Sequence, residues 1–222
     1  MHVPDGFLDL WVAGLFWLAS GVAIGVAVRR ARSELGDERT PLLGVVAAGV
    51  FAAQMLNWPI PGGTSAHFVG GAFAGVLLGP SLGVLAMTAV VTIQALVFGD
   101  GGIVALGINL FAMAVVDVVV GYLLFRGLRG VHETGAAFAA GWLAVTASAG
   151  VVAVGVGVSS AFAYQLDVTV PVMVGGHAAL GLIEGAITAA VYGAVANARP
   201  DLVLGRSAPG EDGLLDAPEV DA

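Results

Sequence analysis

The chain has 222 residues, of which 58% are hydrophobic and only 11% are charged, with a formal net charge of −8. Soluble globular proteins carry about 25% charged residues, so this composition excludes an ordinary water-soluble fold. The chain contains no cysteine, which also excludes disulfides and thiolate metal sites.

The first nine residues, MHVPDGFLD, come before the first apolar stretch. They lack the basic region and the small-residue cleavage site of a secretory signal peptide, so we expect Met1 to be the mature terminus. A histidine in second place follows a free α-amine. The amine of Met1, the backbone nitrogen of His2 and its imidazole can bind one ion in fused chelate rings. Such nitrogen sets suit Cu²⁺ or Ni²⁺, and Co²⁺ can also adopt them.

Seven apolar stretches follow the N-terminal segment and predict seven transmembrane helices. These lie at 10–28, 42–56, 67–79, 81–98, 103–125, 136–165 and 173–197. All eight basic residues are arginines, and they fall after the first, fifth and seventh stretches. By the positive-inside rule those segments are cytoplasmic. We therefore predict an all-α integral membrane protein with its N-terminus outside and its C-terminus in the cytoplasm.

The third stretch is too short to cross a bilayer alone, because 67–79 as a helix would rise only about 20 Å. The residues before it, WPIPGGTS at 58–65, cannot form a regular helix. Irregular backbone at membrane depth survives only where protein or water satisfies it. We therefore expect this loop to dip into the membrane and to line a site before a short third helix. The sequence Gly79-Pro80-Ser81 then predicts a tight cytoplasmic turn.

His67 is the second candidate ligand, because it follows this loop and is expected to begin the third helix. A polar side chain at that depth is functional by default, although a bond to a backbone carbonyl would also explain it. If the N-terminal segment folds over the loop, His67 supplies a fourth nitrogen. His132 is interpreted as a solvated loop residue. Further polar residues in or near the apolar stretches, expected to support the loop or the ligands, are Asn57, Ser65, Asn109, His177 and Glu184. The last two are seven residues apart and share one helix face, where support of the ligands and an interhelical hydrogen-bond network explain them equally well.

Two other features concern partners and domains. Gly44, Ala48 and Ala52 share one helix face, which fits either ordinary packing or docking to another membrane subunit. Residues 1–199 are predicted to form a transmembrane metal-binding domain. Residues 200–222 are predicted to form a disordered acidic cytoplasmic tail.

Four segments carry a resemblance to the CbiM/NikM family, the substrate-capture membrane components of energy-coupling-factor transporters for cobalt and nickel. They are MHVPDGFLD at 1–9, PIPGGTSAHFVGG at 59–71, GDGGIVALGIN at 99–109 and HAALGLIEG at 177–185. The resemblance implies an ion held by the Met1 amine, the His2 amide and imidazole, and His67, close to one plane. It does not separate cobalt, which would serve corrin synthesis, from nickel.

The resemblance also implies partners: a transmembrane coupling subunit, two cytoplasmic ATPases and a small auxiliary membrane subunit, with no nucleic acid and no organic cofactor. The chain has no P-loop of the GxxxxGK[ST] type, which fits a transport component without its own ATPase site. Two alternatives stay open. A self-sufficient channel or secondary transporter would need a relay of acidic residues through the membrane. An intramembrane hydrolase would need an arranged nucleophile and base.

Overall fold

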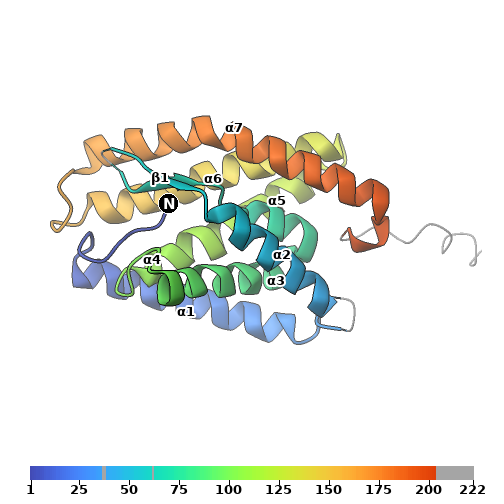
Figure 1. The fold of residues 1–222 in the computed structure, drawn as a ribbon, viewed down its shortest axis with the longest axis horizontal. Coiled ribbons are helices and arrows are strands. Elements are labelled where there is room, and N and C mark those ends of the chain that lie inside the picture. Colours follow the sequence, from blue (N-terminus) through green and yellow to red (C-terminus); the bar gives the residue numbers. More distant parts are fainter. Residues whose placement is uncertain (37–38, 62, 204–222) are drawn as a thin grey trace, which may run out of the picture.

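Long apolar helices dominate the computed structural model, which describes residues 1–36, 39–61 and 63–203 (Figure 1). The elements in chain order are α1 (Leu10–Ala31), α2 (Arg39–Gln54), β1 (Asn57–Pro59), β2 (Ser65–His67), α3 (Gly71–Ile93), the π-helix η1 (Gln94–Phe98), α4 (Leu106–Asn109), the π-helix η2 (Leu110–Val116), α5 (Asp117–Leu128), α6 (Glu133–Gly157), α7 (Leu166–Ala198) and the 3₁₀ helix η3 (Pro200–Leu202). Among the described residues, five helical stretches are long and apolar enough to cross a membrane. They are Leu10–Ala31, Gly71–Phe98, Leu106–Leu128, Glu133–Gly157 and Leu166–Ala198.

The helix α3 reverses direction in its middle. Gly79 has φ 81° and ψ 172°, which no helix contains, and Pro80 follows it. A Cβ added to Gly83 would lie 3.1 Å from the backbone nitrogen of Gly75, eight residues earlier. A continuous helix would separate those residues by about 12 Å along its axis. The predicted turn at Gly79-Pro80 is therefore present, and α3 is a hairpin of two helices.

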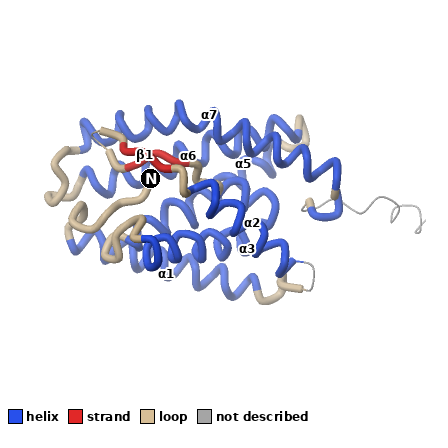
Figure 2. The backbone as a smooth tube through the Cα atoms, in the orientation of Figure 1, coloured by secondary structure: helices blue, strands red, loops and turns tan. Residues whose placement is uncertain are grey.

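The segment between α2 and α3 corrects the all-α prediction, because it forms a short antiparallel pair of strands (Figure 2). Asn57 pairs with His67, and Pro59 pairs with Ser65. His67 therefore ends β2 instead of beginning a helix, and α3 starts at Gly71. Prolines exclude helix here but allow short, two-stranded pairing. The period of two along a strand places the side chains of Ser65 and His67 on one face.

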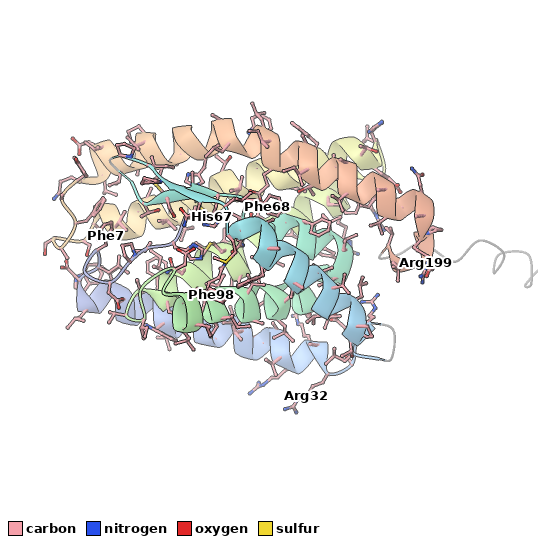
Figure 3. The ribbon with its side chains drawn as sticks, viewed as in Figure 1. Phe7, Arg32, His67, Phe68, Phe98 and Arg199 are labelled. Carbon is pink, nitrogen blue, oxygen red and sulfur yellow. The ribbon has the colours of Figure 1, made fainter. Side chains whose placement is uncertain are left out.

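The stretch 136–165 was predicted as one span, but α6 ends at Gly157. The apolar residues after it form a loop, in which Phe162 is buried against Phe7 with ring centroids 4.7 Å apart. Their hydrophobicity thus serves contact with the N-terminal segment instead of a longer helix. This loop and that segment meet at the end of the bundle away from Arg32 and Arg199 (Figure 3).

The start of the predicted disordered tail is described by the structure. Pro200–Leu202 form η3 and Val203 is buried, so the described start of the tail is structured. The rest of the predicted tail, 204–222, lies outside the described residues.

Within the bundle α6 and α7 approach closely, since a Cβ on Gly141 would lie 3.0 Å from the Cα of Gly185. Such close helix contacts need small residues.

Candidate metal centre

The first three residues lie inside the protein instead of on its surface, and the N-terminus is marked in the middle of the ribbon in Figure 1. Met1 and Val3 are fully buried, and His2 is 4% exposed. Carboxylates further along the segment hold it to two loops. Asp5 accepts hydrogen bonds from the backbone N–H groups of Ile103 (3.0 Å) and Ala105 (3.1 Å).

Asp9 holds the other end of the segment. Its carboxylate accepts hydrogen bonds from the N–H (2.8 Å) and the hydroxyl (2.9 Å) of Ser160. These hydrogen bonds keep the pKa of Asp9 below its ordinary value. The segment is therefore fixed by loops that follow η1 and α6.

Asn109 forms the innermost clamp on the segment. Its side-chain oxygen accepts from the Val3 N–H (2.8 Å), and its side-chain nitrogen donates to the Val3 carbonyl (3.0 Å). The Gly102 N–H donates to the same carbonyl at 2.9 Å. Asn109 thus contacts the N-terminal loop, which is one of the two placements expected from the sequence. It lies where α4 passes into the π-helix η2, and such helix irregularities are frequent at functional sites.

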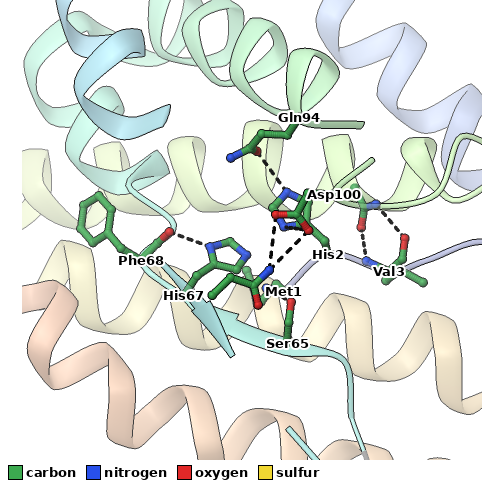
Figure 4. Close-up of polar contacts among 10 residues, drawn as sticks. Met1, His2, Val3, Ser65, His67, Phe68, Gln94 and Asp100 are labelled. Atoms are coloured by element: carbon green, nitrogen blue, oxygen red, sulfur yellow. Dashed lines mark hydrogen bonds and ion pairs between the residues drawn. The ribbon is translucent and has the colours of Figure 1, made fainter. Parts of the chain in front are cut away.

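The amine of Met1 faces the strand β2 and donates to the hydroxyl of Ser65 at 3.2 Å (Figure 4). Burial lowers the pKa of this amine to about 4, against the opposing charges of Asp100 and Glu184. Near neutral pH the amine is therefore uncharged, and its lone pair is available to an ion.

His2 presents one nitrogen toward the same region. Its Nε2 lies 3.1 Å from Oε1 of Gln94, and because an amide oxygen only accepts, Nε2 carries the proton. The Nδ1 atom has no hydrogen-bond partner and lies 3.4 Å from the Asp100 carboxylate. Burial and the nearby Met1 amine lower the pKa of His2 to about 4. Nδ1 is the nitrogen that closes a six-membered chelate ring with the backbone nitrogen of the same residue.

His67 presents the second free imidazole nitrogen. Its Nδ1 donates to the carbonyl of Phe68 at 2.7 Å, so Nε2 keeps its lone pair. Nε2 is buried without a hydrogen-bond partner. The ring stacks on that of His2, with centroids 4.7 Å apart and an angle of 22° between the planes. Burial, the Met1 amine and His2 hold the pKa of His67 well below its ordinary value. The carbonyl bond foreseen as an alternative is present, yet it leaves Nε2 free.

Two residues at this centre had no assigned role in the sequence. They are Gln94 and Asp100, which are not among the candidates predicted from the sequence. Asp100 is in turn held by Asn57, whose side-chain nitrogen lies 3.3 Å from a carboxylate oxygen. Asn57 therefore supports the carboxylate and, through it, the surroundings of His2.

Of the two candidates on α7, Glu184 holds the chain that follows the β-hairpin, while His177 bonds within α7 to the Met173 carbonyl. His177 and Glu184 are both buried, as expected for one helix face. The Glu184 carboxylate accepts from the backbone N–H groups of Val69 (3.0 Å) and Gly70 (2.7 Å). Gln54 donates to the Val69 carbonyl from the other side. The chain just after His67 is thus fixed between α2 and α7.

The remaining candidates lie away from this centre. Gly44, Ala48 and Ala52 are exposed along α2, so a partner or lipid can reach them. His132 is exposed and accepts from the Gly135 N–H at 2.9 Å, at the start of α6.

Within the described ranges, no three His, Cys, Asp or Glu side chains lie close enough to hold an ion. The nitrogens gathered here include only two such side chains, because the others come from the chain terminus and its backbone.

Comparisons with known proteins place the chain among metal transporters. A family model described as CbiM, cobalt uptake substrate-specific transmembrane region, matches residues 2–202. A putative metal transport protein of Haloquadratum walsbyi is 79% identical over 92% of this chain and 94% of that protein. The putative fused nickel transport protein NikMN of Archaeoglobus fulgidus is 54% identical over 95% of this chain and 70% of that protein.

More distant relatives and solved structures agree. The cobalt transport protein CbiM of Geobacter sulfurreducens is 33% identical over 91% of this chain and 61% of that protein. A crystal structure described as a truncated transition metal transporter superposes with a TM-score of 0.85 at 30% identity. It covers 89% of this chain, and this chain covers 99% of it.

Proposed function

This chain belongs to the CbiM family, the cobalt uptake substrate-specific transmembrane region, and we propose that it is the component that captures Co²⁺ or Ni²⁺ for an importer. It is a multi-pass membrane protein of a family that transports metals and is not an enzyme. The observation that carries the proposal is the buried Met1 amine beside two imidazole nitrogens without hydrogen-bond partners.

The proposed ligands are four nitrogens: the Met1 amine, the His2 amide, Nδ1 of His2 and Nε2 of His67. Metal binding removes the amide proton, so a divalent ion with these ligands carries a net charge of +1. A buried charge needs a nearby counter-charge. The Asp100 carboxylate, 3.4 Å from Nδ1 of His2, supplies it.

Transport is proposed to need partners: a transmembrane coupling subunit, two cytoplasmic ATPases and a small auxiliary membrane subunit. The fused nickel relative supports the auxiliary subunit, because about a third of that protein has no counterpart in the part that aligns. With the α3 hairpin counted as two spans, the path crosses the membrane seven times. The end that carries Arg32 and Arg199 then faces the cytoplasm, and the ion enters from the opposite face.

We propose cobalt as the cargo, for corrin synthesis, with nickel uptake by the same machinery as the alternative. The relatives carry both metals in their names. A self-sufficient channel or secondary transporter is the second alternative, since the described interior holds the buried acids Asp117 and Glu184. Purification from native membranes separates these cases. Co-purifying ATPase subunits and ATP-dependent Co²⁺ uptake are expected, whereas uptake by the chain alone in vesicles would support the channel.

Gln94 is expected to tune affinity through the tautomer of His2. Its replacement in Gln94→Leu removes the acceptor that keeps the proton on Nε2, so Nδ1 is no longer fixed as the free nitrogen. Loss of such an outer partner typically weakens metal binding about 10- to 100-fold. Gln94→Glu keeps an acceptor and should stay close to the native affinity. The exposed Gln165→Leu serves as the control, and equal Co²⁺ affinity in all three by calorimetry would exclude this role.

Acid is expected to weaken Co²⁺ binding about tenfold per pH unit between pH 8 and pH 5. The pKa values of the Met1 amine and His2 lie at about 4, so neither group takes up a proton within this range. The amide of His2 must still release its proton to bind the ion, and acid opposes that release. Calorimetry in two buffers of different ionisation enthalpy should count about one proton released per ion. An affinity that is constant from pH 8 to pH 5 would remove the amide from the ligand set.

A further inference from the structure

A pocket of about 250 Å³ opens on the α7 side of His67, between α2, α6 and α7. Its walls are apolar apart from three residues, His67, His177 and Glu184. Figure 3 labels His67 at the β-hairpin, next to Phe68. Polar groups that converge in an otherwise apolar pocket mark the default binding site in a protein.

His177 presents a free nitrogen in this pocket. Its Nδ1 donates to the carbonyl of Met173 at 2.8 Å, which leaves the lone pair on Nε2. The residue is fully buried, and Nε2 has no hydrogen-bond partner. A buried acceptor without a partner costs stability, so such an atom in a native protein calls for a function. His67 shows the same arrangement, with Nδ1 bound to a carbonyl and Nε2 free.

The path of the chain brings the imidazoles of His67 and His177 to similar positions along the axis of α7. The Thr64 N–H lies 3.4 Å from the sulfur of Met173, and Gly70 donates to Glu184. Six residues of extended chain span about 20 Å, and eleven residues of helix span about 16 Å. Residues 64–70 therefore run alongside α7 in the same direction. His67, half-way along this segment, comes level with α7 within about one turn of His177.

We infer that His67 and His177 form a second, weak position for Co²⁺ or Ni²⁺, which the ion occupies on its way inward. This inference rests on the proposed function, because His67 belongs to both positions. When the N-terminal segment withdraws, three of the four capture ligands leave with residues 1 and 2, and His67 alone still holds the ion. His177 offers the next lone pair, and Glu184 in the same pocket offers the counter-charge.

The second position should bind weakly, because only two imidazoles are offered and no group of three ligating side chains occurs in the described part of the chain. Weak binding suits a transit position, since an ion that moves on must not be held tightly.

The test uses a chain with two glycines ahead of Met1, which is expected to lose the capture site. Calorimetric titration of this chain with Co²⁺ in detergent should show residual binding at least 100-fold weaker than in the native chain. His177→Gln and His67→Gln in the extended chain should each weaken that residual binding a further tenfold or more. In the native chain, His177→Gln should change the tight affinity less than threefold. His132→Gln, which alters an exposed histidine, should have no effect in either background.

Three other outcomes would contradict the second position or the capture site. If the extended chain binds no Co²⁺ up to about 1 mM, or binds it equally with and without His177, the second position does not exist and the capture site stands. If His177→Gln abolishes tight binding in a native chain with an unchanged melting temperature, His177 belongs to the capture site and the inference is wrong. If the extension itself leaves tight binding intact, it is the proposed ligand set that fails.

Discussion

Two glycines added ahead of Met1 are expected to weaken Co²⁺ and Ni²⁺ binding at least 100-fold. The amine would move by about 7 Å, two Cα spacings, away from the His2 amide and imidazole. The chelate rings through residues 1 and 2 could then no longer close. The added residues also find no space, because Met1 is fully buried. Two glycines are chosen because a single one would place the histidine third in the chain, and that arrangement is itself a Ni²⁺ chelate.

The measurement is calorimetric titration of detergent-solubilised protein, with the N-terminal residue verified by mass spectrometry. A chain with two glycines appended after Ala222 provides the matched control, because it has the same composition and a native amine. It should bind as the unmodified protein does. Tight binding by the N-terminally extended chain would show that the amine is not a ligand.

Replacement of His67 is expected to have a comparable effect, with at least a 100-fold loss of affinity for both ions in His67→Phe. This variant keeps an aromatic ring against His2 but has no nitrogen for the ion. The loss would therefore report the missing ligand and not the missing stacking contact, whose centroids are 4.7 Å apart. His67→Ala removes both and should bind no better than His67→Phe.

The control for this pair is His132→Phe, which changes a histidine that caps α6 in the exposed loop. Melting temperatures of all variants show whether the bundle is intact. Should His67→Phe retain the native affinity while the glycine extension abolishes it, the fourth ligand lies elsewhere, and Asp100, 3.4 Å from Nδ1 of His2, is the next group to test.

The helices could be predicted from the sequence because an uncharged apolar run that is long enough to span the bilayer predicts a transmembrane helix. The turn at Gly79-Pro80 was also readable, since this dipeptide interrupts a helix. The β-hairpin was not, because each strand has only three residues and two prolines fall within or beside them. Too few residues alternate there to give a period of two. For the same reason the sequence predicts His67 at the start of a helix, whereas it ends β2 and is buried.

In the candidate centre, only the proposed ligands with an unusual position in the sequence could be predicted. His2 is unusual because it follows the free α-amine of the chain. His67 is unusual because it follows an irregular loop rich in proline and glycine. Gln94 and Asp100 were not assigned, because their contacts with His2 join residues more than ninety positions apart. One signal was present: a glutamine in an apolar stretch is costly and therefore functional by default. The sequence did not show which residue it would meet.

The buried N-terminus has a consequence for biosynthesis. The first residues leave the ribosome before any group that will hold them, since Met1 meets Ser65 and Asp9 meets Ser160. Contacts of such long sequence separation form late in folding. The N-terminal residues must therefore stay unpaired, with a free amine, until α6 and the loop that follows it have been inserted. Residues 1 and 2, which are synthesised first, can therefore complete the candidate metal centre only after most of the bundle has been made.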